Sequence, residues 1–447
     1  MTPPNILYLH SHDTGRYIQP YGYPVDTPNL QRLAGEGVTF RNAFSAAPTC
    51  SPSRAALLTG QNPHAAGMLG LAHRGFALNA PSRHLAGVLA AAGYHTVLAG
   101  MQHVAHGTDA ISACGYQEIH ADPDRAETIA AEFLRGNPRQ PFFLDAGFTE
   151  THRVGTSFGE SPDEEEWIER QARWARPPAP LPDIPEVRRD MAAFLASVRR
   201  LDRKIGVILD ALDESGLAEN TLVIYTPDHG LAFPRIKCTL TDQGIGVALI
   251  ARGPVGFKGG RVIDALVSQL DVYPTLCELA GIDLPKWLEG RSLLPLVRGD
   301  IESVRDEIFA EVTFHAAYEP MRAVRTARWK YIRRFSSRRR LALPNVDDSP
   351  TKTALLDLGW AERELPNEEL YDLMLDPAEV DNRASDPGAQ AVLSELRGRL
   401  DRWMEATDDP LLGDGIPLAA EIAINDPDGL SPSEEPTRYT EPIFREG

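Results

Sequence analysis

The sequence predicts an α/β protein with a large, mostly parallel sheet covered by helices on both faces and a smaller C-terminal α+β subdomain. Two observations support this fold class. Short runs of apolar and β-branched residues alternate with helical patterns through the first three hundred residues, which is the element order that a parallel sheet requires. Near residue 316 the pattern changes to two alternating segments joined by a turn, which is typical of antiparallel strands.

Five runs in the first part are predicted to be strands. Each is apolar at consecutive positions, as expected for strands that are buried on both faces. Parallel neighbours need a crossover between them, so helices are expected in the intervening segments. The five runs are Asn5–Leu9, Thr96–Ala99, Pro141–Gly147, Thr221–Thr226 and Gly246–Ala251.

Four helices are predicted between these strands. The first begins at Thr27, an N-cap residue before Pro28, and ends at Gly35 or Gly37. The longest carries apolar side chains every three or four residues, as a helix that covers one face of a sheet must. This longest helix runs from Arg189 to Leu212. The remaining two run from Ser82 to Ala92 and over Asp271–Ala280.

The C-terminal part is predicted to begin with an antiparallel hairpin formed by Met321–Val324 and Trp329–Arg334. An amphipathic helix follows from Val392 to Met404. The tail from Asp408 is rich in Asp, Pro and Glu and is expected to form irregular arms on the body or to be partly disordered. We therefore predict two domains, residues 1–315 and residues 316–447.

Charge excludes some classes of partner. The chain has 447 residues, with 45 Lys and Arg against 63 Asp and Glu, so its formal net charge is −18. This charge repels a phosphate backbone, so nucleic acid is not expected as a general partner. A small anion can bind only in a pocket where the charge is locally reversed.

The chain shows no targeting or membrane signal. Its N-terminus lacks the basic segment and the long apolar stretch of a secretory signal, and no run has the length of a membrane span. We therefore predict a cytoplasmic protein without membrane contact. The four cysteines lie far apart without a CxxC pair, which predicts buried thiols rather than disulfides. Cys50 is the exception, because it lies in a motif.

The segment from Thr49 to Gly60 places a cysteine directly before a predicted helix. Pro52 and Arg54 occupy the first turn of this helix. An anion at this position would meet free backbone N–H groups, the positive end of the helix and a guanidinium.

This segment resembles the sulfatase family, whose C-x-P-x-R motif is matched by Cys50, Pro52 and Arg54 and is followed by the expected A-L-L-T-G. The resemblance extends over most of the chain and is strongest to the heparan N-sulfatases (sulfamidases). It implies an alkaline-phosphatase-like fold, a catalytic first domain and an enzyme that hydrolyses a sulfate ester or a sulfamate. Further matching segments are Asn5–Asp13, 67–71, 100–104, 151–153, 226–230, 320–322 and 369–373.

The resemblance also implies that Cys50 is oxidised to formylglycine, which makes a formylglycine-generating enzyme a partner in maturation. Hydrated formylglycine has two hydroxyls. One attacks sulfur and expels the alcohol or amine, and the other is later deprotonated so that sulfate leaves and the aldehyde returns. Two easier steps then replace one difficult displacement. An unmodified Cys50 lacks the second hydroxyl, so turnover would stall.

The metal ligands implied by the resemblance are His12, Asp13, Asp228, His229 and residue 50 itself. Both Asp residues follow predicted strands, at the sheet edge where α/β proteins bind ligands. His12 stands where the family usually has Asp, and His229 where it usually has Asn. An all-oxygen site suits Ca²⁺, whereas two imidazoles favour Mn²⁺, Zn²⁺ or Fe²⁺. One divalent cation is expected, and its identity stays open.

The remaining site roles also come from the resemblance. Arg54, Lys237 and His152 are expected to hold the sulfate, and His152 to protonate the leaving group. His103 is the expected base, while His73 and Arg153 are candidate substrate contacts.

One further departure from the family pattern concerns charge. Met101 stands where the family usually has Lys, and we hypothesise that this lost positive charge compensates the carboxylate lost at position 12.

Three functions remain open from the sequence. The first is a sulfatase that acts on a sulfated sugar or on an aryl or alkyl sulfate. The second is a phosphodiesterase or phosphonate monoester hydrolase of the same superfamily, in which an Asp-His pair such as Asp228-His229 often binds manganese. The third is a non-catalytic binding protein. Specificity is expected in the loops 150–190 and 335–365, whose shape the sequence does not give. It does not specify the oligomeric state either, and an oligomer is compatible with it.

Overall fold

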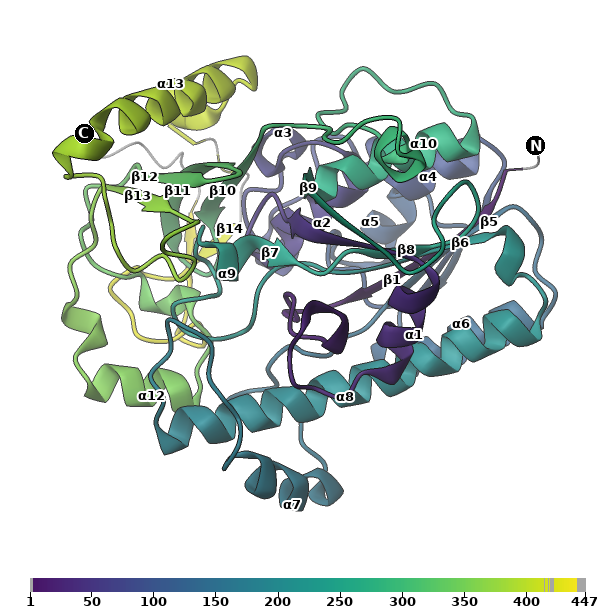
Figure 1. The fold of residues 1–447 in the computed structure, drawn as a ribbon, viewed down its shortest axis with the longest axis horizontal. Coiled ribbons are helices and arrows are strands. Elements are labelled where there is room, and N and C mark those ends of the chain that lie inside the picture. The colour runs from purple at the N-terminus through teal and green to yellow at the C-terminus, as the bar shows by residue number, and fades with distance from the viewer. Residues whose placement is uncertain (1–2, 414, 417, 419–421, 440–447) are drawn as a thin grey trace.

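A computed structural model describes residues 3–413, 415–416, 418 and 422–439 of the chain. Its centre is a nine-stranded sheet in the order β4-β3-β5-β1-β6-β8-β2-β7, with β9 paired to β2, and helices lie on both sides of it (Figure 1). The strands of this sheet are β1 (Asn5–Ser11), β2 (Val38–Phe44), β3 (His95–Gly100), β4 (Glu118–His120), β5 (Phe142–Gly147), β6 (Thr221–Pro227), β7 (Gly246–Val247), β8 (Ile250–Arg252) and β9 (Arg261–Ser268).

The sheet is parallel in its middle and mixed at one side. β1 pairs in parallel with β5 and β6, and β3 pairs in parallel with β4 and β5, so the predicted sheet is confirmed. The prediction of one buried strand over Gly246–Ala251 is wrong. This run is divided into β7 and β8, which pair antiparallel with β2 and β6. An apolar run indicates burial on both faces but not strand direction, which explains the error.

The two faces of the sheet bury alternate residues of each strand. Leu7 and Leu9 of β1 pack on the side that holds α1, α6 and α8. Ile6 and Tyr8 pack on the opposite side, where α2, α4 and α10 lie (Figure 1). This alternation is the period of two that a strand imposes. The helices of the first part of the chain are α1 (Pro28–Glu36), α2 (Cys50–Thr59), α3 (Pro63–Ala66), α4 (Leu85–Ala91), α5 (Thr108–Ala113), α6 (Ala126–Arg135), α7 (Pro162–Gln171), α8 (Pro185–Glu214), α9 (Asp242–Ile245), α10 (Val272–Ala280) and α11 (Leu294–Arg298).

The four predicted helices are present as α1, α4, α8 and α10. Thr27 is the N-cap of α1 and Gly37 its C-cap, as the sequence predicts. α8 begins four residues earlier than predicted because Pro185 occupies its first turn, where a missing N–H costs nothing. All four cysteines have free, buried thiols. None of the helices described here is long and apolar enough to cross a lipid bilayer.

The C-terminal part forms a second, four-stranded antiparallel sheet in the order β10-β11-β12-β13. The predicted hairpin is confirmed as β11 and β12, and the predicted amphipathic helix as α13, which lies over these strands (Figure 1). The sheet begins before residue 316, so its first strand belongs to the segment predicted as the first domain. The bounds are β10 (Glu307–Phe314), β11 (Tyr318–Thr326), β12 (Trp329–Arg334), β13 (Glu368–Asp372), α12 (Pro350–Asp357) and α13 (Gln390–Ala406).

The described part of the tail is ordered against the body. β14 (Ile422–Ile424) pairs with β15 (Thr437–Tyr439), and the segment between them is irregular. Asn425 and Pro432 both accept hydrogen bonds from Arg74, which lies in the first part of the chain. The predicted irregular arms are therefore confirmed for these residues, whereas other parts of the tail lie outside the described residues.

A buried ionic cluster joins the C-terminal sheet to α3. Arg322 of β11 is fully buried and forms two hydrogen bonds to Asp409, and its Nε lies 3.3 Å from Glu311 of β10. Glu311 in turn accepts hydrogen bonds from the backbone N–H and the ring Nδ1 of His64 on α3. α3 follows closely after α2, so this cluster fixes the C-terminal sheet against the helix that begins with Cys50.

We predict that Arg322→Met destabilises the protein by about 3–5 kcal/mol, because Asp409 and Glu311 would stay buried without their cation. The free energy of unfolding from guanidinium denaturation measures this effect. The matched control is Arg41→Met, which removes an exposed ion pair with Asp264 and should cost about 1 kcal/mol or less. Equal losses for the two variants would contradict the assigned role of the cluster.

Candidate functional site

The site begins where two neighbouring parallel strands end. Ser11 of β1 pairs with Pro227 of β6, so the residues that follow these strands emerge at the same edge of the sheet. Asp13 and Asp228 lie next to each other there, and the backbone N–H of Asp13 donates a 2.8 Å hydrogen bond to Oδ1 of Asp228. Both carboxylates are buried. This edge is the position that the sequence predicts for ligand binding.

Cys50 reaches the same point from the first turn of α2. Its side chain is buried, and Sγ lies 3.4 Å from Nε2 of His229. Burial raises the pKa of the Cys50 thiol well above its usual range, although Lys237 acts in the opposite direction. The thiol is therefore neutral at pH 7, so the site does not favour a thiolate nucleophile.

The donors around Cys50 fit a divalent cation. One donor atom each from His12, Asp13, Cys50 and Asp228 lie within 4.8 Å of one another. His12 Nδ1 lies 3.3 Å from Asp13 and 3.2 Å from Asp228. His12 Nδ1 and Asp13 Oδ1 are buried without a hydrogen-bond partner, which is costly for polar atoms unless a cation is present. A set that mixes imidazole nitrogen with carboxylate oxygen suits a transition ion.

His229 completes this donor set. Its Nδ1 lies 3.0 Å from the carbonyl oxygen of Gly230, to which it can donate. In that tautomer the lone pair of Nε2 faces the cluster, 3.0 Å from Oδ1 of Asp13. The structure therefore brings together all five predicted ligand residues, and His12 and His229 both fit as ligands. Their assignment as metal ligands stays a prediction.

Two cations balance the two buried carboxylates. Arg54 donates to Asp228 at 2.9 Å, and Lys237 donates to Asp13 at 3.0 Å. Burial alone would raise the pKa of Asp13, but Lys237, His12 and His229 hold it well below its usual range. The pKa of Lys237 is raised because Asp13 and Asp347 outweigh burial. Both predicted cations thus lie at the site in their charged forms.

A hydrogen-bonded chain behind Arg54 was not predicted from the sequence. His10 Nδ1 lies 2.5 Å from Nη1 of Arg54, and its Nε2 lies 2.8 Å from Asp145. Tyr116 donates to the other oxygen of Asp145. His10 therefore accepts from Arg54 and donates to Asp145, which fixes the guanidinium in place. His10 lies in β1 opposite Gly147 of β5. The ring needs this glycine, because a Cβ at position 147 would lie 2.4 Å from it.

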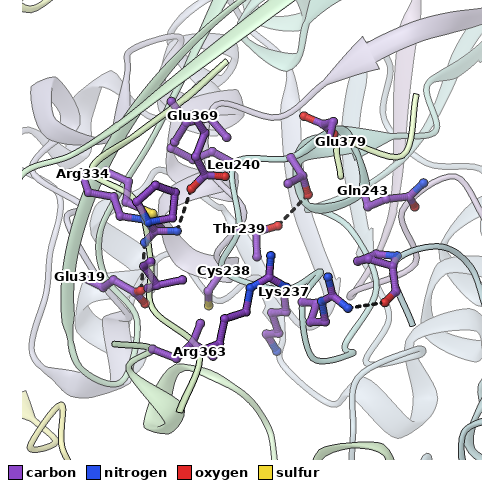
Figure 2. A pocket seen from close by; sticks show the side chains of 18 of the residues that line it. Lys237, Cys238, Thr239, Leu240, Gln243, Glu319, Arg334, Arg363, Glu369 and Glu379 are labelled. Atoms are coloured by element: carbon purple, nitrogen blue, oxygen red, sulfur yellow. Dashed lines mark hydrogen bonds and ion pairs between the residues drawn. The ribbon is translucent and has the colours of Figure 1, made fainter. Parts of the chain in front are cut away.

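Asp347 is a second site residue that sequence reasoning missed. It accepts a 2.8 Å hydrogen bond from Lys237, so this cation lies between two carboxylates. Asp347 comes from the loop predicted to carry specificity, and no motif marks it. Lys237 also borders a cavity of about 170 Å³ behind the site, which we call the rear cavity. In Figure 2 Lys237 and Cys238 lie at its centre, with Arg334 between Glu319 and Glu369 on one side. Cys238 thus packs against this cavity, away from the donor set.

A larger cavity of about 630 Å³, which we call the site cavity, gives access to the donors. Its wall contains the predicted residues His12, His73, His103, His152 and Arg153, and also Met101, Glu150 and Arg200. Arg54 and Lys237 lie behind this wall, paired with the two aspartates. The cavity therefore presents four imidazoles at its surface, while the charges of Arg54 and Lys237 lie behind its wall.

His103 and His73 form a pair in the cavity wall. The ring Nδ1 of His73 lies 3.1 Å from Nε2 of His103, and the two rings are stacked. A ring nitrogen of His103 lies within 4.8 Å of Cys50 Sγ, and its Nδ1 is buried without a partner. Burial, His12 and Arg54 lower the pKa of His103 well below its usual range. His103 is therefore neutral at pH 7 and can accept a proton.

His152 and Arg153 have different surroundings. The Nδ1–H of His152 donates to the carbonyl of Arg153 at 2.6 Å, so Nε2 is the free nitrogen, 3.9 Å from Asp13. The guanidinium of Arg153 is buried, bonded twice to Asp190 and stacked on Phe158. Arg153 lines the cavity, but its guanidinium is already paired with Asp190. The geometry therefore favours a structural role over the predicted contact with substrate.

The comparisons with known proteins agree with this geometry. The family model described as Sulfatase matches residues 4–282, and the one described as N-sulphoglucosamine sulphohydrolase, C-terminal, matches residues 234–356. The chain is 31% identical to N-sulphoglucosamine sulphohydrolase of Homo sapiens, with 91% of each chain covered. It is 30% identical to an ulvan-active sulfatase of Formosa agariphila, with 91% of this chain and 75% of that protein covered. The solved structure of a 2-O GAG sulfatase superimposes with a TM-score of 0.70 at 24% identity, covering 91% of this chain and 93% of that one. The predicted alkaline-phosphatase-like fold is thereby confirmed.

We predict that the two histidines set the metal preference. In the double variant His12→Asp/His229→Asn, oxygen donors replace both imidazoles, so the ratio of Ca²⁺ affinity to Zn²⁺ affinity should rise about tenfold or more. Calorimetric titration of metal-free protein measures both affinities. His120→Asn, at an exposed position outside the site, is the control and should leave the ratio unchanged. An unchanged ratio in the double variant would exclude both histidines as ligands.

Met101 lies in the same cavity wall as His12, which supports the hypothesis that the two departures from the family pattern compensate each other. We predict that Met101→Lys alone weakens divalent metal binding about tenfold, because an ammonium group repels the ion and no added carboxylate offsets it. The double variant Met101→Lys/His12→Asp should recover most of this loss. Additive effects in this cycle, measured by metal titration, would disprove the compensation.

Proposed function

The chain belongs to the sulfatase family, and we propose that it hydrolyses the sulfate ester or sulfamate of a sulfated sugar, with residue 50 acting as formylglycine beside one divalent cation. The supporting observation is the placement of Cys50. Its Sγ lies at a helix N-terminus among the donors of His12, Asp13 and Asp228, all within 4.8 Å. A nucleophile, a cation and a tetrahedral anion can share this one position.

The group at residue 50 supplies the reactive hydroxyls: once oxidised and hydrated it is a geminal diol, and the cation lowers the pKa of a hydroxyl and withdraws charge from the sulfate. The protein residues fix this arrangement. Arg54 is held by Asp228, Ser11 O and His10, so its charge stays beside the helix end. Lys237 is held between Asp13 and Asp347 and keeps a second positive charge at the sulfate position.

Two histidines are placed for proton transfer. His152 presents Nε2 to the cavity, and its side chain is 36% exposed, so solvent can add a proton to Nε2, which the imidazolium then donates to the leaving alcohol or amine. His103 is neutral and lies within 4.8 Å of the residue 50 side chain, so it can take the proton of the second hydroxyl when sulfate is released. The acid and the base therefore come from separate segments.

A sulfated sugar is the proposed substrate class because the two relatives compared above are named for such substrates. The choice between ester and sulfamate stays open. A second candidate is hydrolysis of a phosphodiester or phosphonate monoester, since Asp228 and His229 both face the donor set. We keep the cytoplasmic location as a prediction.

The proposal is tested by mass spectrometry of the peptide containing residue 50, together with a substrate panel. We expect a peptide lighter than the cysteine form, and turnover of an aryl sulfate or glucosamine N-sulfate in preference to an aryl phosphodiester and phenylphosphonate. Cys50→Ala should lower kcat by about a thousandfold or more, since the nucleophile is lost.

Cys277→Ala, which removes another buried thiol, is the control and should keep the lighter peptide and most of the activity. Full activity with an intact thiol at residue 50, or after removal of divalent ions by a chelator, would contradict the proposal. Preference for either phosphorus substrate would favour the second candidate.

A further inference from the structure

A second cavity lies next to the site cavity and shares His73 with it. We call it the side cavity; it has a volume of about 430 Å³. His73 also lines the site cavity, and its ring contacts His103, a ring nitrogen of which lies within 4.8 Å of Cys50 Sγ. The two cavities therefore meet at His73, whose ring contacts the histidine next to the reacting residue.

The side cavity is basic in a strongly acidic protein. Its titratable lining consists of His73, Arg74, His106, Cys114 and Arg438, and no Asp or Glu lines it among the described residues. The whole chain carries a formal net charge of −18, and Arg74 places in this wall a cation that no described carboxylate neutralises. The rest of the lining is apolar or glycine, which lowers the local dielectric and strengthens the field of the cations.

Arg74 gives this cavity a positive charge that no described ion pair offsets. Its guanidinium donates to neutral oxygens, the side-chain oxygen of Asn425 at 2.6 Å and the carbonyl of Pro432 at 3.2 Å. Nε of Arg74 is buried without a partner. Burial lowers the pKa of Arg74, and no carboxylate raises it. A cation in this state is stabilised by an added anion.

We propose that the side cavity is a subsite for a second anionic group of the substrate, a sulfate or a carboxylate, so that the preferred substrates are sugars with at least two anionic groups. This inference rests on the proposed function, because the first anionic group is the sulfate bound at residue 50. Exposed Arg438 of β15, from the C-terminal tail, also lines this cavity. The tail thereby takes part in substrate selection.

The test compares three probes on the Cys50→Ala protein, which binds without turnover. They are glucosamine 2-N-sulfate, glucosamine 2-N,6-O-disulfate, and the disaccharide of glucuronate and glucosamine 2-N-sulfate. By calorimetry, at least one dianionic probe should bind about tenfold more tightly than the monosulfate, as a charge-assisted contact provides. The probe that gains affinity identifies the second group as sulfate or carboxylate.

Two variants locate the contact. In Arg74→Gln and Arg438→Gln the ratio between dianionic and monoanionic affinity should fall toward one. Arg438→Gln lies on an exposed strand and leaves the core intact, so it remains informative if Arg74→Gln loosens the tail. Arg402→Gln, an exposed arginine on α13 outside the cavity, should leave the ratio unchanged.

The outcomes separate the two levels of the proposal. The subsite is overturned if the ratio of dianionic to monoanionic affinity is near one for both dianionic probes on the Cys50→Ala protein, or if a high ratio persists in both arginine variants. Either result leaves the proposed function standing as long as the unsubstituted protein hydrolyses sulfated substrates. Absence of binding for all three probes, together with absence of turnover, overturns the proposed function and the subsite with it.

Discussion

The site depends on two buried carboxylates, Asp13 and Asp228, held within 4.8 Å of each other at the edge of a parallel sheet. Like charges this close are unfavourable in a medium of low dielectric unless cations accompany them. The chain provides Arg54 for one and Lys237 for the other, and a set of donor atoms that would accept a divalent ion between them. The parallel pairing of β1 with β6 makes this possible, because it brings the carboxyl ends of both strands to one edge. The sheet topology that brings the two carboxylates together therefore also creates the need for cations beside them.

Much of the fold could be predicted because its strands and long helix follow simple periods. β1, β3, β5 and β6 are continuous apolar runs, and α8 repeats its apolar side chains at helical spacing. Prediction failed where burial does not determine pairing: the run from Gly246 to Ala251 is divided into two antiparallel pieces, and β2 and β9, with exposed residues within them, were missed. The hydrophobic pattern indicates which faces of a strand are buried. The direction of the strand depends on the connection that leads into it, which the pattern does not describe.

Prediction of the site followed the same division. Cys50, Arg54 and the two aspartates could be predicted because each belongs to a recognisable motif, and the parallel pairing of β1 with β6 and the position of α2 bring these distant motifs together. His10 and Asp347 were missed because their roles arise from partners far away in the chain, Asp145 and Lys237. Arg153 was predicted to contact substrate because it is next to His152. In the structure its guanidinium pairs instead with Asp190 of α8, a partner that the local sequence does not reveal. Residues that act through long-range pairs carry no local signature.

The side chain of Cys50 is 1% exposed in the folded protein, enclosed by the first turn of α2 and the ends of β1 and β6. An enzyme that modifies this residue must reach Sγ, and a buried helix start does not permit that approach. If residue 50 is converted to an aldehyde, the conversion must occur on the nascent or unfolded chain. The specific activity of a preparation would then depend on the rate of oxidation relative to the rate of folding during biosynthesis. If folding were faster, the protein would be correctly folded but inactive.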